Sequence, residues 1–156
     1  MIGRGSIAGL GGLAAMGVIV KAASGLKGGD DQPPSKWSEA EPPAKFAHRV
    51  IEGVALRHVS IDRAGLLNNA MHLTYAPALG LWYGVFQESF RPPPLVHGLL
   101  FGSTVWSLRL ALNPALKLKE PFWRDPLARN VIDCSFHITF GLAVAYAYRE
   151  LERRGV

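Results

Sequence analysis

The segment "NNAMHLTYAPALGLWY" (68–83) has a counterpart in "DCSFHITFGLAVAYAY" (133–148), at a constant offset of 65 residues. The offset aligns Asn68 with Asp133, His72 with His137, Thr74 with Thr139, Tyr75 with Phe140 and Tyr83 with Tyr148. Each copy places a histidine four residues after an Asx residue in an otherwise apolar segment. Residues four apart share one face of a helix. The repeat therefore predicts two related helices that each carry a polar pair.

The composition favours a membrane protein over a soluble domain. Apolar residues make up 49% of the 156-residue chain and charged residues only 19%. The net charge of +5 is compatible with nucleic-acid binding, but the basic residues form no cluster interleaved with aromatic residues. Basic residues that flank apolar segments are typical of lipid headgroup contacts. We therefore expect the partners to include the bilayer and to exclude nucleic acid.

Four apolar segments are long enough to cross a bilayer as helices, which takes about 20 residues. They cover residues 5–23, 65–87, 95–113 and 131–149. The predicted fold is all-α: a single membrane domain over 1–156 with four transmembrane helices in two tandem hairpins. Hairpin 1 covers 5–87 with a loop at 24–64, and hairpin 2 covers 95–150 with a loop at 114–130.

The first segment admits a second interpretation. Its basic start at Arg4 and the small residues in "KAASG" are also found in cleavable signal peptides. Its weakly hydrophobic middle and its glycine spacing favour a retained helix. Gly5, Gly9 and Gly12 in this segment, and Gly98 and Gly102 in the third, form strips where another helix can approach closely.

Both long loops contain features suited to a membrane surface. "AKFAHRVIEGVALRHV" (44–59) places Phe46, Val50 and Val54 near one helical face, which predicts an interfacial helix. A surface helix packed on protein fits the same periodicity. Trp37 in the first loop and Phe122 with Trp123 in the second are expected to anchor the loops at the interface.

Three interpretations of the repeated polar pairs compete. The first is a hydrogen-bonded network that fixes helix packing, formed by Asn68, His72, Tyr75, Tyr83, Asp133, His137 and Tyr148. The second is a proton or ion path that uses Asp133, His137 and His72. The third is bis-histidine ligation of haem b by His72 and His137, with a two-histidine, one-carboxylate metal site as a remote variant. We expect the network, with no cofactor and no metal.

The second half of the chain resembles a known family in the order and spacing of short motifs. "HLTYAPALGLWYGVF", "HGLLFGSTVW", "LNPALKLKEPFWRDP" and "DCSFHITFGLAVAYAYRELE" together span about residues 66–152 and are similar to the YagU-like bacterial inner-membrane proteins. The matching positions are His72, Gly98, Pro121, Trp123, Asp133 and His137. The resemblance implies a bacterial multi-pass inner-membrane protein, linked with acid tolerance and without an assigned reaction.

No catalytic sequence motif, such as a nucleophile elbow, phosphate loop, dinucleotide fingerprint or zinc-protease motif, occurs in the chain. We therefore expect a non-enzymatic accessory subunit whose glycine faces pack against other subunits or against copies of itself. A small proton- or ion-linked transporter is the alternative. Both termini are expected in the cytoplasm, because Arg4, Arg149, Arg153 and Arg154 flank the outer spans.

Overall fold

The computed structural model describes residues 2–27 and 33–156, and these contain helices and no strand. The long helices are α1 (Ile2–Lys27), α3 (Ala64–Phe90), α4 (Pro94–Ala115) and α5 (Leu127–Arg153). The first loop contains α2 (Pro42–Ala55) and the 3-10 turn η1 (Ile61–Arg63), and the second contains the 3-10 turn η2 (Phe122–Arg124). Part of the predicted linker, 28–32, lies outside the described residues. The all-helical prediction is confirmed.

The helix ends are set by proline and by left-handed backbone. Pro42 and Pro94 start α2 and α4, where proline lacks only an amide that would be unpaired anyway. Arg91, with φ 47°, ends α3, and its amide bonds the carbonyl of Gln87. α4 continues past the predicted end at Asn113-Pro114 and closes at Ala115. A proline in the last turn is tolerated when few helical residues follow it.

Three helices among the described residues are long and apolar enough to cross a membrane: α1 over Gly3–Ala22, α4 over Pro94–Ala115 and α5 over Leu127–Arg153. The predicted second span corresponds to α3, which is 27 residues long but does not meet that test. Asn68, Asn69, His72 and Gln87 reduce its apolar character. Three candidate spans among the described residues support a membrane protein.

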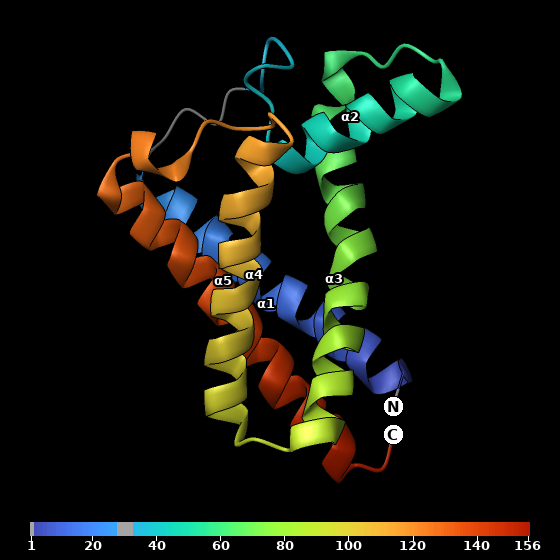
Figure 1. Ribbon diagram of the computed structural model, residues 1–156, viewed down its shortest axis with the longest axis vertical. Coiled ribbons are helices and arrows are strands. Elements are labelled where there is room, and N and C mark those ends of the chain that lie inside the picture. The colour runs from blue at the N-terminus through green and yellow to red at the C-terminus, as the bar shows by residue number, and fades with distance from the viewer. Residues whose placement is uncertain (1, 28–32) are drawn as a thin grey trace.

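The long helices pack in the order α3, α1, α5, α4. α1 packs along α3 on one side and along α5 on the other, and α4 packs along α5. Figure 1 shows α3 and α5 running from the end that holds α2 and η2 toward the end that holds both termini. We call these the loop end and the terminal end. The backbones of α3 and α4 are close only near the short turn that joins them.

Glycine makes these contacts close. A Cβ added to Gly5 would lie 2.6 Å from the carbonyl oxygen of Gly80, and one added to Gly98 would lie 3.0 Å from that of Gly141. Gly9 faces Ala76, Gly12 faces Phe140 and Val144, and Gly102 faces His137. All five glycines that the sequence analysis selected for packing thus contact helices of the same chain. The expectation that these strips are free for another subunit is wrong, because the helices of one chain occupy them.

At the loop end, α2 lies across the ends of α3 and α4 (Figure 1). Ala40, Ala44 and Ala64 form a small buried cluster between α2 and α3. Lys45 Nζ donates to the carbonyl of Leu118 at 3.0 Å, and Arg49 donates to those of Leu116 and Lys117 at 2.5 and 2.8 Å. Basic side chains favour helix C-termini, where carbonyls lack partners. α2 therefore links the start of α3 to the end of α4.

Candidate functional site

A group of polar side chains from α3, α4 and α5 surrounds Asp133. Arg109 on α4 forms an ion pair with Oδ2 of Asp133 across the α4–α5 contact. Trp106 Nε1, one turn earlier on α4, donates to the same oxygen at 3.1 Å. Both charged side chains are about one quarter exposed. The carboxylate is thus neutralised within the chain.

The two histidines of the repeat have matching local geometry. His72 Nδ1 lies 2.8 Å from the carbonyl oxygen of Asn68, and His137 Nδ1 lies 2.8 Å from that of Asp133. The expected contact of each histidine with the preceding Asx side chain is therefore made mainly with its backbone. His137 Nδ1 is 4.0 Å from Asp133 Oδ1, and Asn68 Oδ1 is buried without a hydrogen-bond partner.

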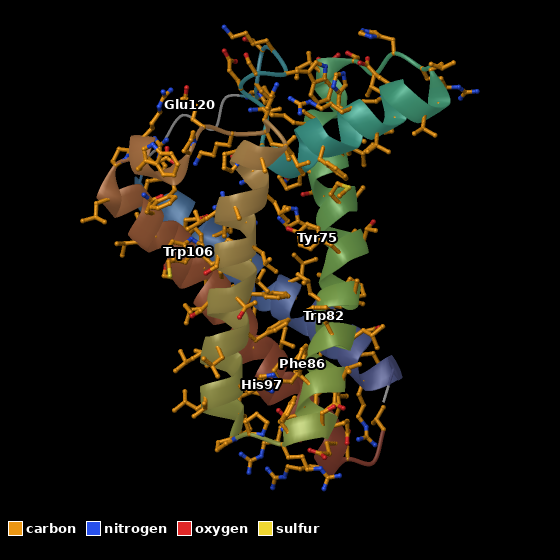
Figure 2. The ribbon with its side chains drawn as sticks, in the orientation of Figure 1. Tyr75, Trp82, Phe86, His97, Trp106 and Glu120 are labelled. Atoms are coloured by element: carbon orange, nitrogen blue, oxygen red, sulfur yellow. The ribbon has the colours of Figure 1, made fainter. Side chains whose placement is uncertain are left out.

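These side chains form one group, which we call the loop-end cluster. It consists of His72, Tyr75, Trp106, Arg109, Asp133 and His137 (Figure 2 labels Tyr75 and Trp106). The ring centroids of His72 and Tyr75 are 5.0 Å apart. His137 lies close enough to His72 and Arg109, and Tyr75 close enough to Arg109, for a charge on one group to influence the other. The two copies of the repeated motif therefore lie close together in space.

Sequence reasoning missed Arg109 and Trp106. Arg109 is a strongly basic residue inside the third apolar segment, where an isolated charge is costly. Such a charge is commonly paired with an opposite charge on a neighbouring helix. Asp133 is the acidic residue that lies inside one of the predicted apolar segments, so it was the candidate partner. That signal was present in the sequence, but choosing the pair required knowledge that α4 packs along α5.

A second polar group, which we call the terminal-end cluster, surrounds the two equivalent tyrosines. It consists of Arg4, Tyr83, Gln87, Glu88, His97 and Tyr148. The Tyr83 hydroxyl donates to Gln87 Oε1 at 3.2 Å, and His97 Nδ1 lies 2.5 Å from the same oxygen. The ring of Tyr83 stacks on His97, with centroids 4.1 Å apart, and lies 5.6 Å from that of Tyr148.

The outer part of this cluster is ionic. The Tyr148 hydroxyl donates to Glu88 Oε1 at 2.8 Å, and Arg4 Nη1 lies 3.8 Å from the same atom. His97, labelled in Figure 2, is buried, and its ring stacks on that of Tyr83. The α3–α4 turn is short, so His97 in the first turn of α4 faces the end of α3.

An apolar layer separates the two clusters. Ala76, Phe101, Phe140 and Val144 are buried, and the Phe101 and Phe140 rings lie 6.2 Å apart. Along α5, His137, Phe140, Val144 and Tyr148 share one face, so polar, apolar and polar levels alternate along it. The polar groups near His137 thus do not continue directly to those near Tyr148.

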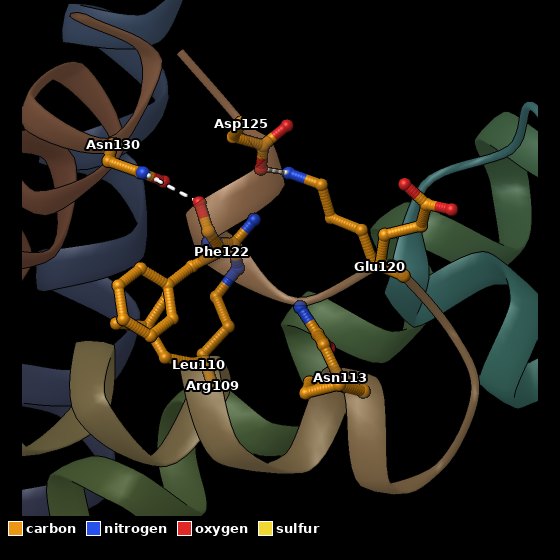
Figure 3. Close-up of a pocket in the computed structure, with 9 residues that line it drawn as sticks. Arg109, Leu110, Asn113, Glu120, Phe122, Asp125 and Asn130 are labelled. Carbon is orange, nitrogen blue, oxygen red and sulfur yellow. Dashed lines mark hydrogen bonds and ion pairs between the residues drawn. The ribbon is translucent and has the colours of Figure 1, made fainter. Parts of the chain in front are cut away.

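A small hollow opens beside Arg109 at the loop end (Figure 3). Its volume of about 10 Å³ is close to the space that one water molecule needs. Asn113, Lys119, Asp125 and Asn130 also line it. Lys119 Nζ lies 2.6 Å from Asp125, and this hydrogen-bonded ion pair lowers the pKa of Asp125 below its usual value.

The expected interface anchors differ from one another in exposure. Phe122 and Trp123 project from η2, and Trp123 is 71% exposed. Trp37 stacks on His48 of α2, with centroids 3.8 Å apart, and packs against the buried alanine cluster. Trp37 therefore holds the first loop onto α2, while the position of Trp123 is compatible with an anchor.

Among the described residues, no three His, Cys, Asp or Glu side chains are close enough together to hold a metal ion. The two-histidine, one-carboxylate site considered from the sequence is thus not assembled in this part of the chain. Comparisons of the chain with protein-family models, with curated proteins and with solved structures find no match.

Proposed function

We propose that this protein is a non-enzymatic, multi-pass membrane protein that acts as an accessory or structural subunit. The observation that supports it best is the bonding within its interior. In both polar clusters most side chains bond to one another or to the backbone, and an apolar layer lies between the clusters. Such groups fix how helices pack and leave no directly connected polar route between the two ends.

The fourth crossing follows from the positions of the other helices. If α1 and α4 cross the bilayer, the chain leaves α1 at the loop end and enters α4 at the terminal end (Figure 1). α3 connects those ends, is about 40 Å long and packs along α1 through Gly5, Gly9 and Gly80. We infer four crossings in two hairpins, with both termini on one side.

One exposed surface that a partner could contact is the aromatic side of α3. Trp82, Phe86 and Phe90 follow one another at intervals of four residues, and their rings are adjacent: the centroids are 5.4 Å apart for Trp82 and Phe86, and 6.3 Å for Phe86 and Phe90. All three side chains are exposed. Aromatic side chains contribute strongly to protein interfaces. We propose that this aromatic column contacts a helix of another subunit or a second copy.

We propose that the protein lies in a bacterial inner membrane with both termini in the cytoplasm, as its resemblance to the YagU-like bacterial inner-membrane proteins implies. The similarity of short motifs over about 66–152 supports this proposal, as do the arginines near both termini.

The test compares complexes in membranes solubilised with a mild detergent and separated by native electrophoresis. The wild-type chain, of 16.9 kDa, should migrate in a larger complex. Trp82→Ala combined with Phe86→Ala should reduce that complex to the single chain. Leu100→Ala, on the exposed side of α4, should leave it intact. Migration of the wild-type protein as a single chain would refute the accessory role.

A proton- or ion-linked transporter is the second candidate, because His72, Asp133 and His137 belong to the same cluster as Arg109, and Arg109 lines a water-sized hollow. In liposomes, this candidate requires proton flux that Asp133→Asn or His137→Ala abolishes without unfolding the protein. Under the accessory function, neither the wild-type protein nor these variants conduct protons.

A further inference from the structure

α2 presents three different sides to its surroundings. Ala44 and Ala47 are buried on the side that packs on α3. Lys45 and Arg49, on a second side, bond the carbonyls that follow α4. Phe46, Val50 and Val54 lie on a third side and are exposed. α2 thus has an apolar strip that no described part of the chain covers.

The contacts of α2 place this strip at the level where the bilayer would end. Arg49 bonds the carbonyls of Leu116 and Lys117, which directly follow Ala115, the last residue of a candidate span. Figure 1 shows α2 crossing over α3 and extending beyond it. An amphipathic helix in this position buries its apolar side in the headgroup and acyl boundary.

The charges at the tip of α2 indicate which lipids would be favoured. Leu56, which follows α2, is 87% exposed, and Val54 is 81% exposed. Arg57 and Arg63 flank this tip, and their guanidinium groups have no ion pair or hydrogen bond within residues 2–27 and 33–156.

The acidic groups near the tip already have partners. Glu52 lies 3.1 Å from His48 and 2.9 Å from His58, and Asp62 accepts a hydrogen bond from Ser60. Neither carboxylate is bonded to Arg57 or Arg63. Two guanidinium groups without an ion pair among the described residues therefore lie beside exposed aliphatic side chains, an arrangement that suits an anionic lipid surface.

We propose that α2 docks on the bilayer surface and prefers anionic phospholipids. Phe46, Val50, Val54 and Leu56 enter the acyl boundary, while Arg57 and Arg63 contact lipid phosphates. This inference rests on the proposed membrane insertion of the long helices. It adds a contact between α2 and the lipid surface. The hydrogen bonds of Lys45 and Arg49 would connect that contact to the residues that follow α4.

The test uses the full chain in nanodiscs, with Cys134→Ser and one new cysteine carrying an environment-sensitive fluorophore. Val54→Cys reports the apolar strip. Ala55→Cys, the next residue on a different side of α2, is the matched control. Leu100→Cys on the exposed side of α4 reports insertion of the long helices. Quenching by brominated lipid is measured in neutral and in anionic nanodiscs.

The label at Val54 should be quenched several-fold more strongly than the label at Ala55, and most strongly in anionic lipid. One basic residue near an anionic surface changes partitioning by about fivefold, which corresponds to about 1 kcal/mol. Arg57→Gln with Arg63→Gln should therefore lower the docked-to-undocked ratio by about 25-fold. Quenching at Val54 should then fall to its value in neutral lipid.

Each contrary outcome has a distinct meaning. Equal quenching at Val54 and Ala55, with strong quenching at Leu100, overturns docking and leaves membrane insertion intact. Strong quenching at Val54 that depends on neither lipid charge nor the arginines overturns the anionic preference. No quenching at Leu100 overturns the proposed function itself.

Discussion

Substitution of Gly9 by alanine tests the contact between α1 and α3. A Cβ at this position would lie 2.9 Å from the carbonyl carbon of Ala76 and 3.1 Å from Cα of Gly80, and closer still to the carbonyl oxygen of Ala76. These are backbone atoms, which cannot rotate away. Gly9→Ala therefore forces the two helices apart by about 0.5–1 Å, a gap that forfeits a quarter to a half of the attraction across it.

The expected net cost follows from two opposing effects. Overpacking of this kind costs about 1–3 kcal/mol, and replacing glycine by alanine inside a helix recovers up to about 1 kcal/mol. We expect Gly9→Ala to lower the free energy of unfolding by about 1–2 kcal/mol. A carbon added at Gly17 on the same helix meets no other described part of the chain within 4 Å, apart from the adjacent backbone of its own helix. Gly17→Ala should be neutral or stabilising by up to about 1 kcal/mol.

The assay is unfolding by sodium dodecyl sulfate in mixed micelles, followed by circular dichroism. Equal unfolding midpoints for Gly9→Ala and Gly17→Ala would refute the α1–α3 packing. A second result would also contradict the α1–α3 packing. If Gly9→Ala dissolves a complex without changing the unfolding of the single chain, Gly9 faces another subunit, as the sequence alone had suggested.

Four further predictions follow from the same structure. Arg109→Leu should destabilise the protein by about 1–3 kcal/mol, because the partly buried Asp133 loses its partner. Arg109→Leu combined with Asp133→Leu should cost less than the sum of the two single changes, and additive costs in chemical unfolding would contradict the pair. Lys119 lowers the pKa of Asp125, so the stability from this pair is present above the unfolded pKa of about 3.9 and is lost as pH falls through the lower folded pKa. The thermal unfolding midpoint of Asp125→Asn should therefore depend less on pH in this acidic range than that of the wild-type protein. An unchanged pH dependence would count against the pair. A membrane-impermeant maleimide should reach Cys134, which is partly exposed, only from the side opposite the termini, and a cysteine from Gly155→Cys in a Cys134→Ser background only from the terminal side; reaction of both from one side contradicts four crossings. The purified protein should be colourless, whereas a Soret band lost in His72→Ala or His137→Ala would establish haem ligation instead.

The sequence predicted the helical elements well, because apolar run length and proline positions are local properties. Each predicted span corresponds to a helix, and the helices extend the spans by one to four residues at each end where an end is described. α3 is the informative exception. Its polar residues weaken the local signal for a span, and only its packing along α1, between helices whose ends it connects, argues for a crossing.

The candidate site was predicted in part. The 65-residue repeat selected His72, His137, Tyr83 and Tyr148. In the structure the ring centroids of the two tyrosines are 5.6 Å apart. The repeat could not reveal Gln87, which bonds both Tyr83 and His97. The 65-residue offset aligns Gln87 with Glu152. Glu152 lies near the exposed end of α5 and does not form equivalent hydrogen bonds within the described residues.

The sequence by itself determined which residues share a helical face, because the helical period fixes that relation along one segment. It therefore identified the glycine strips, the polar pairs and the amphipathic pattern of α2. Only the tertiary structure decided what each face meets: Gly9 faces Ala76 of its own chain, Asp133 pairs with Arg109, and α2 leaves Phe46, Val50 and Val54 uncovered. Partner choice depends on contacts between distant segments, and the periodicity of one segment carries no information about the helix that will lie against it.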